Sequence, residues 1–151
     1  MRFAERLGRQ DWESLLHAPF HAYVHVAGAE GAAIEAQFRR LTDELDAARE
    51  AFGEGSLGQM LVVTLAENLD AMWAGFKEAD RSSKDGLVRA RKVLRKADAA
   101  ESAAIRDWLI NVAVRVSESS RTLGTDVVSP AESQAIHDIA QWLNRPMPET
   151  R

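Results

Sequence analysis

The spacing of apolar residues is the strongest constraint on the fold, because it follows steps of three and four residues over most of the chain. The clearest stripe lies among charged residues and consists of Ile34, Phe38, Leu41, Leu45, Ala48 and Phe52. Such spacing places one continuous apolar face along an amphipathic helix. Alternating patterns typical of strands are almost absent. The periodicity therefore predicts an all-α protein.

Capping residues predict where the helices begin. Ser56 and Gln59 form the Ser-x-x-Gln pattern of a capping box, and Ser129 with Glu132 forms a second one that includes Pro130 at the first helical position. The helices expected from these signals cover 34–52, 56–76, 85–97, 98–116 and 129–143. With the residues before 30, this gives a single bundle of six or seven helices.

The length of 151 residues fits one helical domain over 1–151. The spacing of Phe38, Leu41 and Leu45 reappears in the last helix, where it is occupied by Ile136, Ile139 and Leu143. This similarity suggests two pseudo-repeated helix–loop–helix halves, 18–52 and 105–144.

Composition narrows the compartment and the class of partner. The chain has no cysteine, which excludes disulfides and thiolate metal sites and favours the cytoplasm. The opening "MRFAERLGRQ" lacks the apolar core of a secretory signal, and "MLVVTLA" at 60–66 is too short to span a bilayer. The net charge of −4 argues against nucleic acid as a general partner.

Three histidines, His17, His21 and His25, are spaced four residues apart, which is about one helical turn. Pro19 has no amide hydrogen and clashes with the preceding turn, so we expect a helix to begin there. His17 then lies before this helix, and a short terminal helix that begins near Asp11 ends at the proline.

The remaining pair, His21 and His25, can bind zinc if a third ligand arrives. Glu30 and His137 are candidates for that ligand. Two alternatives stay open: the imidazoles pack against nearby core aromatics, or they form a pH-sensitive contact.

An acidic residue precedes a glycine where the first long helix ends, at Glu30 and Gly31. Glycine readily adopts the left-handed conformation of a turn, and a carboxylate beside it can accept amide hydrogens or ligate a hard cation. The alternative is an ordinary turn at the C-terminus of a helix.

The stretch "APFHAYVHVAGAEGAAIEAQFRRL" at 18–41 resembles the helix–acidic-glycine-loop–helix of the TerB-like family of tellurite-resistance and stress-response domains. The stretch from "NVAVRVSESS" to "AIHDIAQWL" is similar in its closing Ser-x-x-Glu helix start. The resemblance implies an all-helical, non-enzymatic binding or scaffold module. It further implies that Glu30, Asp126 and Glu132 hold a divalent metal ion.

Basic residues gather between 84 and 96, where six cations face one acid and produce a local charge of +5. This segment could meet phosphates, an acidic membrane surface or an acidic partner. The alternative is a solvated face that pairs with acidic neighbouring helices. The candidate contact residues are Arg89, Arg91, Lys92, Arg95 and Lys96.

Two of the four tryptophans, Trp73 and Trp108, fall on strongly apolar faces and are expected in the core. Trp12 and Trp142 are expected at the margin of the bundle, where they cover helix ends or form the surface of a homodimer.

No residue is nominated for catalysis. The sequence therefore predicts a stress-response type of binding module with a protein partner. The alternative is a regulatory protein whose basic helix, 84–96, contacts a polyanion or an acidic partner.

Overall fold

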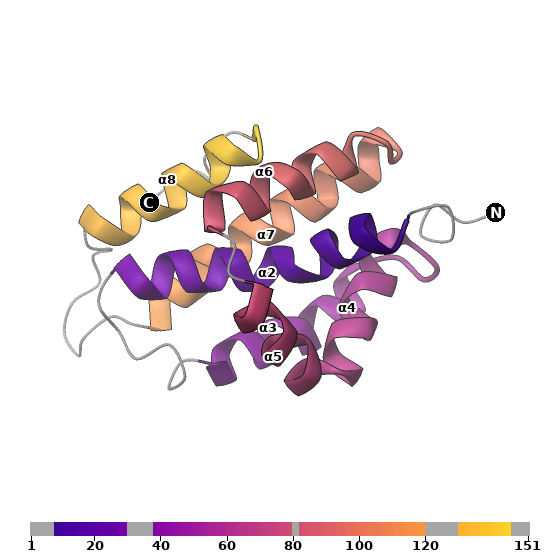
Figure 1. The fold of residues 1–151 in the computed structure, drawn as a ribbon, viewed down its shortest axis with the longest axis horizontal. Coiled ribbons are helices and arrows are strands. Elements are labelled where there is room, and N and C mark those ends of the chain that lie inside the picture. The colour runs from indigo at the N-terminus through magenta and orange to yellow at the C-terminus, as the bar shows by residue number, and fades with distance from the viewer. Residues whose placement is uncertain (1–7, 30–37, 80–81, 120–129, 146–151) are drawn as a thin grey trace.

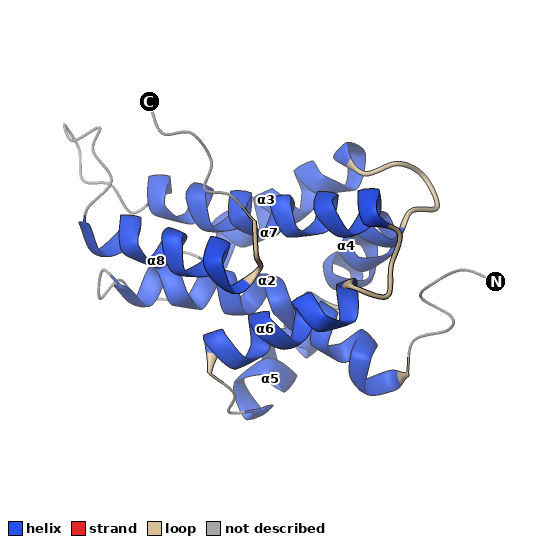
Figure 2. Ribbon diagram, turned by 90° about the horizontal axis from the view of Figure 1, so that it is seen from above, coloured by secondary structure: helices blue, strands red, loops and turns tan. Residues whose placement is uncertain are grey.

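The computed structural model describes residues 8–29, 38–79, 82–119 and 130–145. These residues form helices and no strand (Figures 1 and 2). The helices are α2 (Arg9–Ala29), α3 (Phe38–Ala51), α4 (Leu57–Glu67), α5 (Leu69–Ala79), α6 (Ser83–Leu94), α7 (Ala99–Ser119) and α8 (Pro130–Trp142). The prediction of an all-α helical bundle is confirmed.

Helix α2 lies at the centre of the bundle and packs against α5, α6, α7 and α8. In the view of Figure 1, α6 and α8 lie on one side of it and α4 and α5 on the other. Its side chains Phe20 and Tyr23 are fully buried. Helix α7 packs against α2, α3, α4 and α8, and residues such as Leu109 and Val112 are buried there. Helices α2 and α7 therefore each contact most of the other helices.

The predicted helix start at Pro19 is wrong, because Pro19 lies inside the continuous helix α2. A proline in a helix interior removes one backbone hydrogen bond and costs about 3 kcal/mol. Pro19 is itself buried, as are its neighbours in the sequence, Ala18 and Phe20. Burial of α2 between several helices offsets the local cost. As a result His17 is part of the same helix as the other two histidines.

The expectation of one helix over 56–76 is also wrong, since the chain breaks at Asn68 between α4 and α5. The backbone of Asn68 leaves the helical region, with φ −130° and ψ 28°. Its N–H donates to the Leu65 carbonyl and its side-chain amide donates to the Thr64 carbonyl at 3.0 Å. Asparagine competes for backbone partners in this way, and it therefore favours helix ends.

The capping box predicted at Ser56 is present with a small displacement. The Ser56 hydroxyl accepts a hydrogen bond from the Gln59 amide at 3.2 Å. The Gln59 side chain accepts one from the amide of Gly55, at 2.8 Å, instead of that of Ser56. Helix α6 begins similarly, with the Ser82 hydroxyl accepting from the Asp85 amide at 3.1 Å.

The tryptophans divide as the sequence predicts. Trp73 and Trp108 are each 8% exposed, whereas Trp12 and Trp142 are partly buried and pack against the edge of the core. Trp142 contacts the His25 ring, with 4.7 Å between ring centroids. A homodimer through these residues stays a prediction, as does an internal repeat of 18–52 and 105–144.

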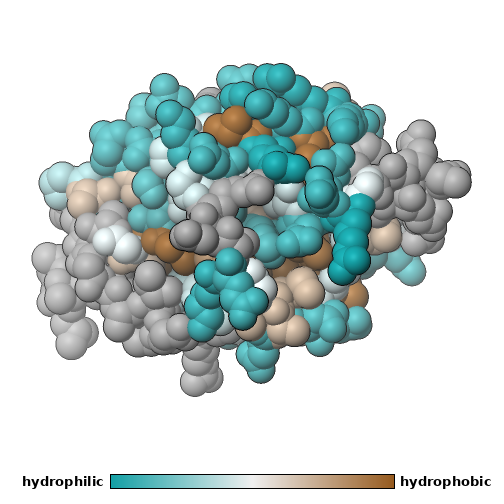
Figure 3. Space-filling model, viewed as in Figure 1, coloured by the Kyte–Doolittle hydropathy of each residue, from teal (hydrophilic) through white to brown (hydrophobic). Residues whose placement is uncertain are grey.

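The face drawn in Figure 3 is largely hydrophilic, and its apolar areas are small and separate. Among the described residues, no helix combines the length and the apolar character that a membrane span requires.

Candidate functional site

His21, the first member of the predicted histidine pair, is 3% exposed and lies between α5 and α6. Its ring meets the edge of Phe76 of α5, with the centroids 4.8 Å apart. On α6 it covers Gly86 so closely that a Cβ at that position would overlap the imidazole. Packing against a core aromatic was one of the alternatives for this residue, and the structure supports it.

His25, the second member, turns toward α8. Its Nε2 lies 3.2 Å from Oδ2 of Asp138, and the other oxygen of that carboxylate accepts a hydrogen bond from Gln134 at 2.9 Å. Its ring also contacts Trp142. The two histidines therefore contact different helices, although they lie one turn apart on α2.

Only one of the three acidic candidates for a metal site lies within the described residues. Glu30 and Asp126 lie outside the described residues, as does Ser129 of the second capping box. Glu132 lies in the first turn of α8 and is 3% exposed. Over the ranges that the structure describes, no group of three histidine, aspartate or glutamate side chains is arranged to hold a metal ion. Metal binding at Glu30 stays a prediction.

The basic segment forms α6 and the short turn after it, and its cations point to two different faces. Arg89, Lys92 and Lys96 line a groove beside the start of α2, together with Asp11 and Asp85. Lys96 Nζ forms an ion pair with Asp11 at 3.0 Å. This face matches the expected alternative, in which basic residues pair with acidic neighbours.

The other face of α6 carries Arg91 and Arg95, and both act electrostatically on Arg106 of α7. The Nε atom of Arg91 is buried and has no hydrogen-bond partner within the described ranges. A fourth arginine, Arg145, follows α8 and also acts on Arg106. We call Arg91, Arg95, Arg106 and Arg145 the arginine cluster.

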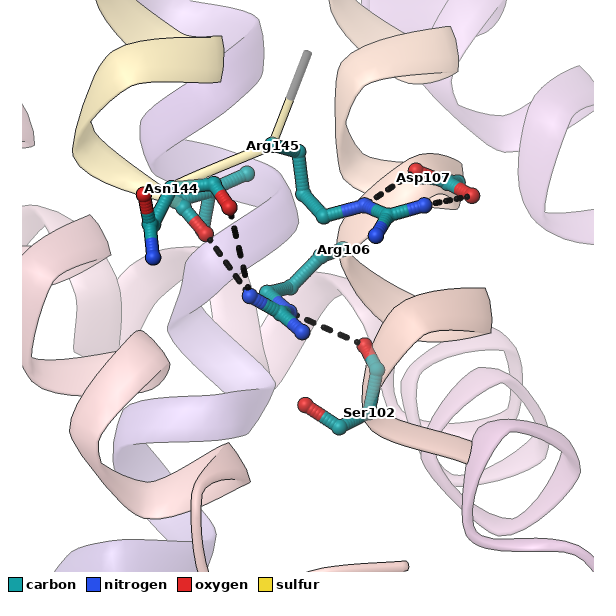
Figure 4. A network of polar contacts seen from close by, with 6 residues as sticks. Ser102, Arg106, Asp107, Asn144 and Arg145 are labelled. Atoms are coloured by element: carbon teal, nitrogen blue, oxygen red, sulfur yellow. Dashed lines mark hydrogen bonds and ion pairs between the residues drawn. The ribbon is translucent and has the colours of Figure 1, made fainter. Parts of the chain in front are cut away.

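Arg106 joins α7 to the end of α8 (Figure 4). Its Nη1 donates to the carbonyls of Leu143 at 3.2 Å and Asn144 at 3.5 Å, and its Nε donates to the Ser102 carbonyl at 3.3 Å. The last carbonyls of a helix carry partial negative charge, which favours a cation at this place.

Arg145 is positioned by the turn that ends α8. Asn144 adopts the left-handed conformation, with φ 56°. The Arg145 amide then donates to the Ala140 carbonyl at 2.9 Å, and the Asn144 amide donates to the Gln141 carbonyl at 3.0 Å. These two bonds are those of a Schellman motif. The turn directs the Arg145 side chain toward α7, as Figure 4 shows.

There the Arg145 guanidinium forms two hydrogen bonds with the Asp107 carboxylate, at 2.8 Å and 2.9 Å. This contact raises the pKa of Arg145. Burial lowers the pKa of Arg106, and the charges of Arg145, Arg91 and Arg95 lower it further, while Asp107 partly compensates. A guanidinium stays protonated at physiological pH, so the cluster keeps four positive charges beside one identified carboxylate.

The sequence indicated Arg91 and Arg95 as candidate contacts but did not indicate Arg106 or Arg145. The only local signal was Asn144 followed by Arg145 at a helix end, which is typical of a left-handed cap. Nothing in the spacing indicated that the charges of Arg91 and Arg145 act on Arg106. They do so because α6, α7 and α8 all end or pass near one region of the bundle.

Neither family models, curated proteins nor solved structures match this chain. The resemblance to the TerB-like family and a role in stress response stay predictions from the sequence.

Proposed function

We propose that the protein is a non-enzymatic binding module that holds an acidic segment of a partner protein on the arginine cluster. The observation that supports this proposal is the buried Nε of Arg91, which has no hydrogen-bond partner within the described ranges. The charges of Arg91, Arg95 and Arg145 also act together on Arg106. Like charges held together are unfavourable in the free protein. An incoming carboxylate relieves that repulsion, and its binding is favoured accordingly.

Two of the four arginines form contacts within the protein, and the other two are available to a partner. Arg106 and Arg145 are already engaged with backbone carbonyls and with Asp107. Arg91 and Arg95 form no hydrogen bond or ion pair through their guanidinium groups within the described ranges, and Arg95 is exposed. They are the residues that contact the partner. Arginine suits this task because its planar fork matches the two oxygens of a carboxylate.

A protein segment fits the charge of the molecule better than a nucleic acid does. The whole chain carries −4, so a long polyanion would be repelled by surfaces away from the cluster. The 84–96 segment also contains no aromatic residue on which a base could stack. Arginine does not exchange protons near neutral pH, and the cluster is therefore suited to holding a ligand more than to acid–base chemistry.

The test is fluorescence anisotropy with a labelled oligoglutamate peptide at low ionic strength. The double variant Arg91→Gln/Arg95→Gln should bind about tenfold more weakly or worse, since it removes two charge-assisted contacts. Binding to the unmodified protein should weaken as salt is added, because exposed charges are screened.

The matched control is Arg89→Gln/Lys92→Gln, which removes the same charge from the other face of α6. This control should change binding by less than about threefold, because only the long-range field is altered. Equal losses of peptide affinity in both double variants would show that only the net charge matters. That result would contradict a specific site. An unmodified protein that does not bind the peptide at low salt would also contradict the proposal.

A further inference from the structure

A polar cavity of about 350 Å³ lies between the first half of α2 and the face of α6 away from the arginine cluster. Helix α2 lines it with Gln10, Glu13, Ser14 and His17, and α6 lines it with Gly86 and Arg89. Residues 89 and 91 point in nearly opposite directions on a helix. The cavity is therefore a separate feature from the arginine cluster.

The packing of His21 on Gly86 brings the two helices together at one end of the cavity. A side chain at position 86 would collide with the His21 ring, so glycine allows the close approach. Toward the start of α2 the walls are the polar side chains of Gln10, Glu13 and Ser14. The Ser14 hydroxyl donates to the Gln10 carbonyl at 2.9 Å, which holds it against its own helix and leaves the cavity open.

Opposite charges face this cavity from its two helices. Glu13 belongs to α2 and Arg89 to α6, and both line it. In the part of the chain that the structure describes, neither side chain forms an ion pair within 4.0 Å. Asp11 and Lys96 provide the contrast, because these neighbours do pair, at 3.0 Å. The cavity thus holds a separated carboxylate and guanidinium.

We propose that this cavity binds a small zwitterion of the free amino acid class. The ligand carboxylate meets the Arg89 guanidinium and the ligand ammonium meets the Glu13 carboxylate. A simple anion would be repelled by Glu13 and a simple cation by Arg89, so neither gains both contacts. A volume near 350 Å³ lies at the small end of ligand pockets, as a ligand of this size requires.

The first test uses the unmodified protein and a matched series of probes in an amide NMR titration. L-serine and L-glutamine at millimolar concentration should shift the amide signals of Gln10, Glu13 and Arg89. N-acetyl-L-serine lacks the ammonium and L-serinamide lacks the carboxylate. Each should bind about tenfold more weakly than L-serine, because one charge-assisted contact is lost.

The second test removes one protein charge at a time. Glu13→Gln and Arg89→Gln should each weaken L-serine binding about tenfold, whereas Lys92→Gln, on the adjoining groove, should leave it unchanged. Circular dichroism checks that the variants keep their helices. The absence of shifts with both amino acids would overturn the proposal, as would blocked derivatives that bind as tightly as L-serine.

This inference is independent of the proposed function. The Arg91→Gln/Arg95→Gln variant, which should lose the oligoglutamate peptide, should bind L-serine like the unmodified protein. The two proposals can therefore fail separately.

Discussion

At the scale of single residues, Gly86 decides how closely α2 and α6 approach. The His21 ring occupies the place where a Cβ would stand, and it is held from the other side by Phe76. Because the ring is 3% exposed, it has little room to turn away. A larger residue at position 86 would have to move either the imidazole or one of the helices.

We predict that Gly86→Ala lowers the free energy of unfolding by about 1–2 kcal/mol. The cost of overpacking exceeds the roughly 1 kcal/mol that alanine gains over glycine in helix propensity. Urea unfolding followed by circular dichroism measures the change.

Gly75 supplies the matched control, since it lies within α5 and a Cβ there meets no atom within 4 Å. Gly75→Ala should therefore stabilise the protein by up to about 1 kcal/mol. The double variant His21→Ala/Gly86→Ala should lose less stability than the two single variants add up to, because the collision is absent. If Gly86→Ala proved as stable as Gly75→Ala, the close contact would not exist.

At the scale of secondary structure, the end of α8 depends on a side chain from another helix. Its Schellman turn satisfies the carbonyls of Ala140 and Gln141 from within. The carbonyls of Leu143 and Asn144 instead accept from Arg106 of α7. The charged side chain of Arg106 thus joins α8 to α7. Repulsion from the neighbouring arginines opposes its charge at this place.

We predict that Arg106→Met frees the last turn of α8. Hydrogen bonds from a charged donor contribute about 1.5–3 kcal/mol each, and relief of repulsion within the arginine cluster offsets part of the loss. The amides of Asn144 and Arg145 should exchange about tenfold faster with deuterium, measured by NMR under native conditions.

Arg115 offers a control on the same helix, because its side chain is 54% exposed and lies 4.0 Å from Glu44. Arg115→Met should change the exchange rates at the end of α8 by less than about twofold. Unchanged protection of Asn144 and Arg145 in Arg106→Met would show that the Schellman turn suffices by itself.

At the scale of the whole molecule, a single cluster of buried apolar residues draws members from every described helix. Helix α2 contacts α4, α5, α6, α7 and α8, and α3 packs against α4 and α7. If one region of the described fold unfolded separately, its residues would have to leave this cluster.

We therefore predict one cooperative unfolding transition. The variant Trp12→Phe/Trp142→Phe retains Trp73 of α5 and Trp108 of α7 as fluorescent probes of the core. Its fluorescence and its far-ultraviolet circular dichroism should change at the same urea concentration, as a two-state transition requires. Transitions at different concentrations would indicate two independently stable parts.

Much of this architecture could be predicted from the sequence, because the properties involved are local. Apolar spacing reports on one helix face at a time, and a cap such as Ser56 with Gln59 is formed by residues three apart. The core positions of Trp73 and Trp108 followed from the same periodicity. The basic character of residues 84–96 was equally evident from the sequence. The division of its charges between two faces of α6 was not.

Tertiary structure decided the rest. Pro19 remains within α2 because burial among several helices outweighs a local cost that the sequence alone would count as decisive. The arginine cluster exists only because the bundle brings Arg91, Arg106 and Arg145 into one region, and electrostatic interaction depends on distance in space. His21 and His25 differ for the same reason: Phe76 and Gly86 surround the first ring, whereas Asp138 of α8 meets the second.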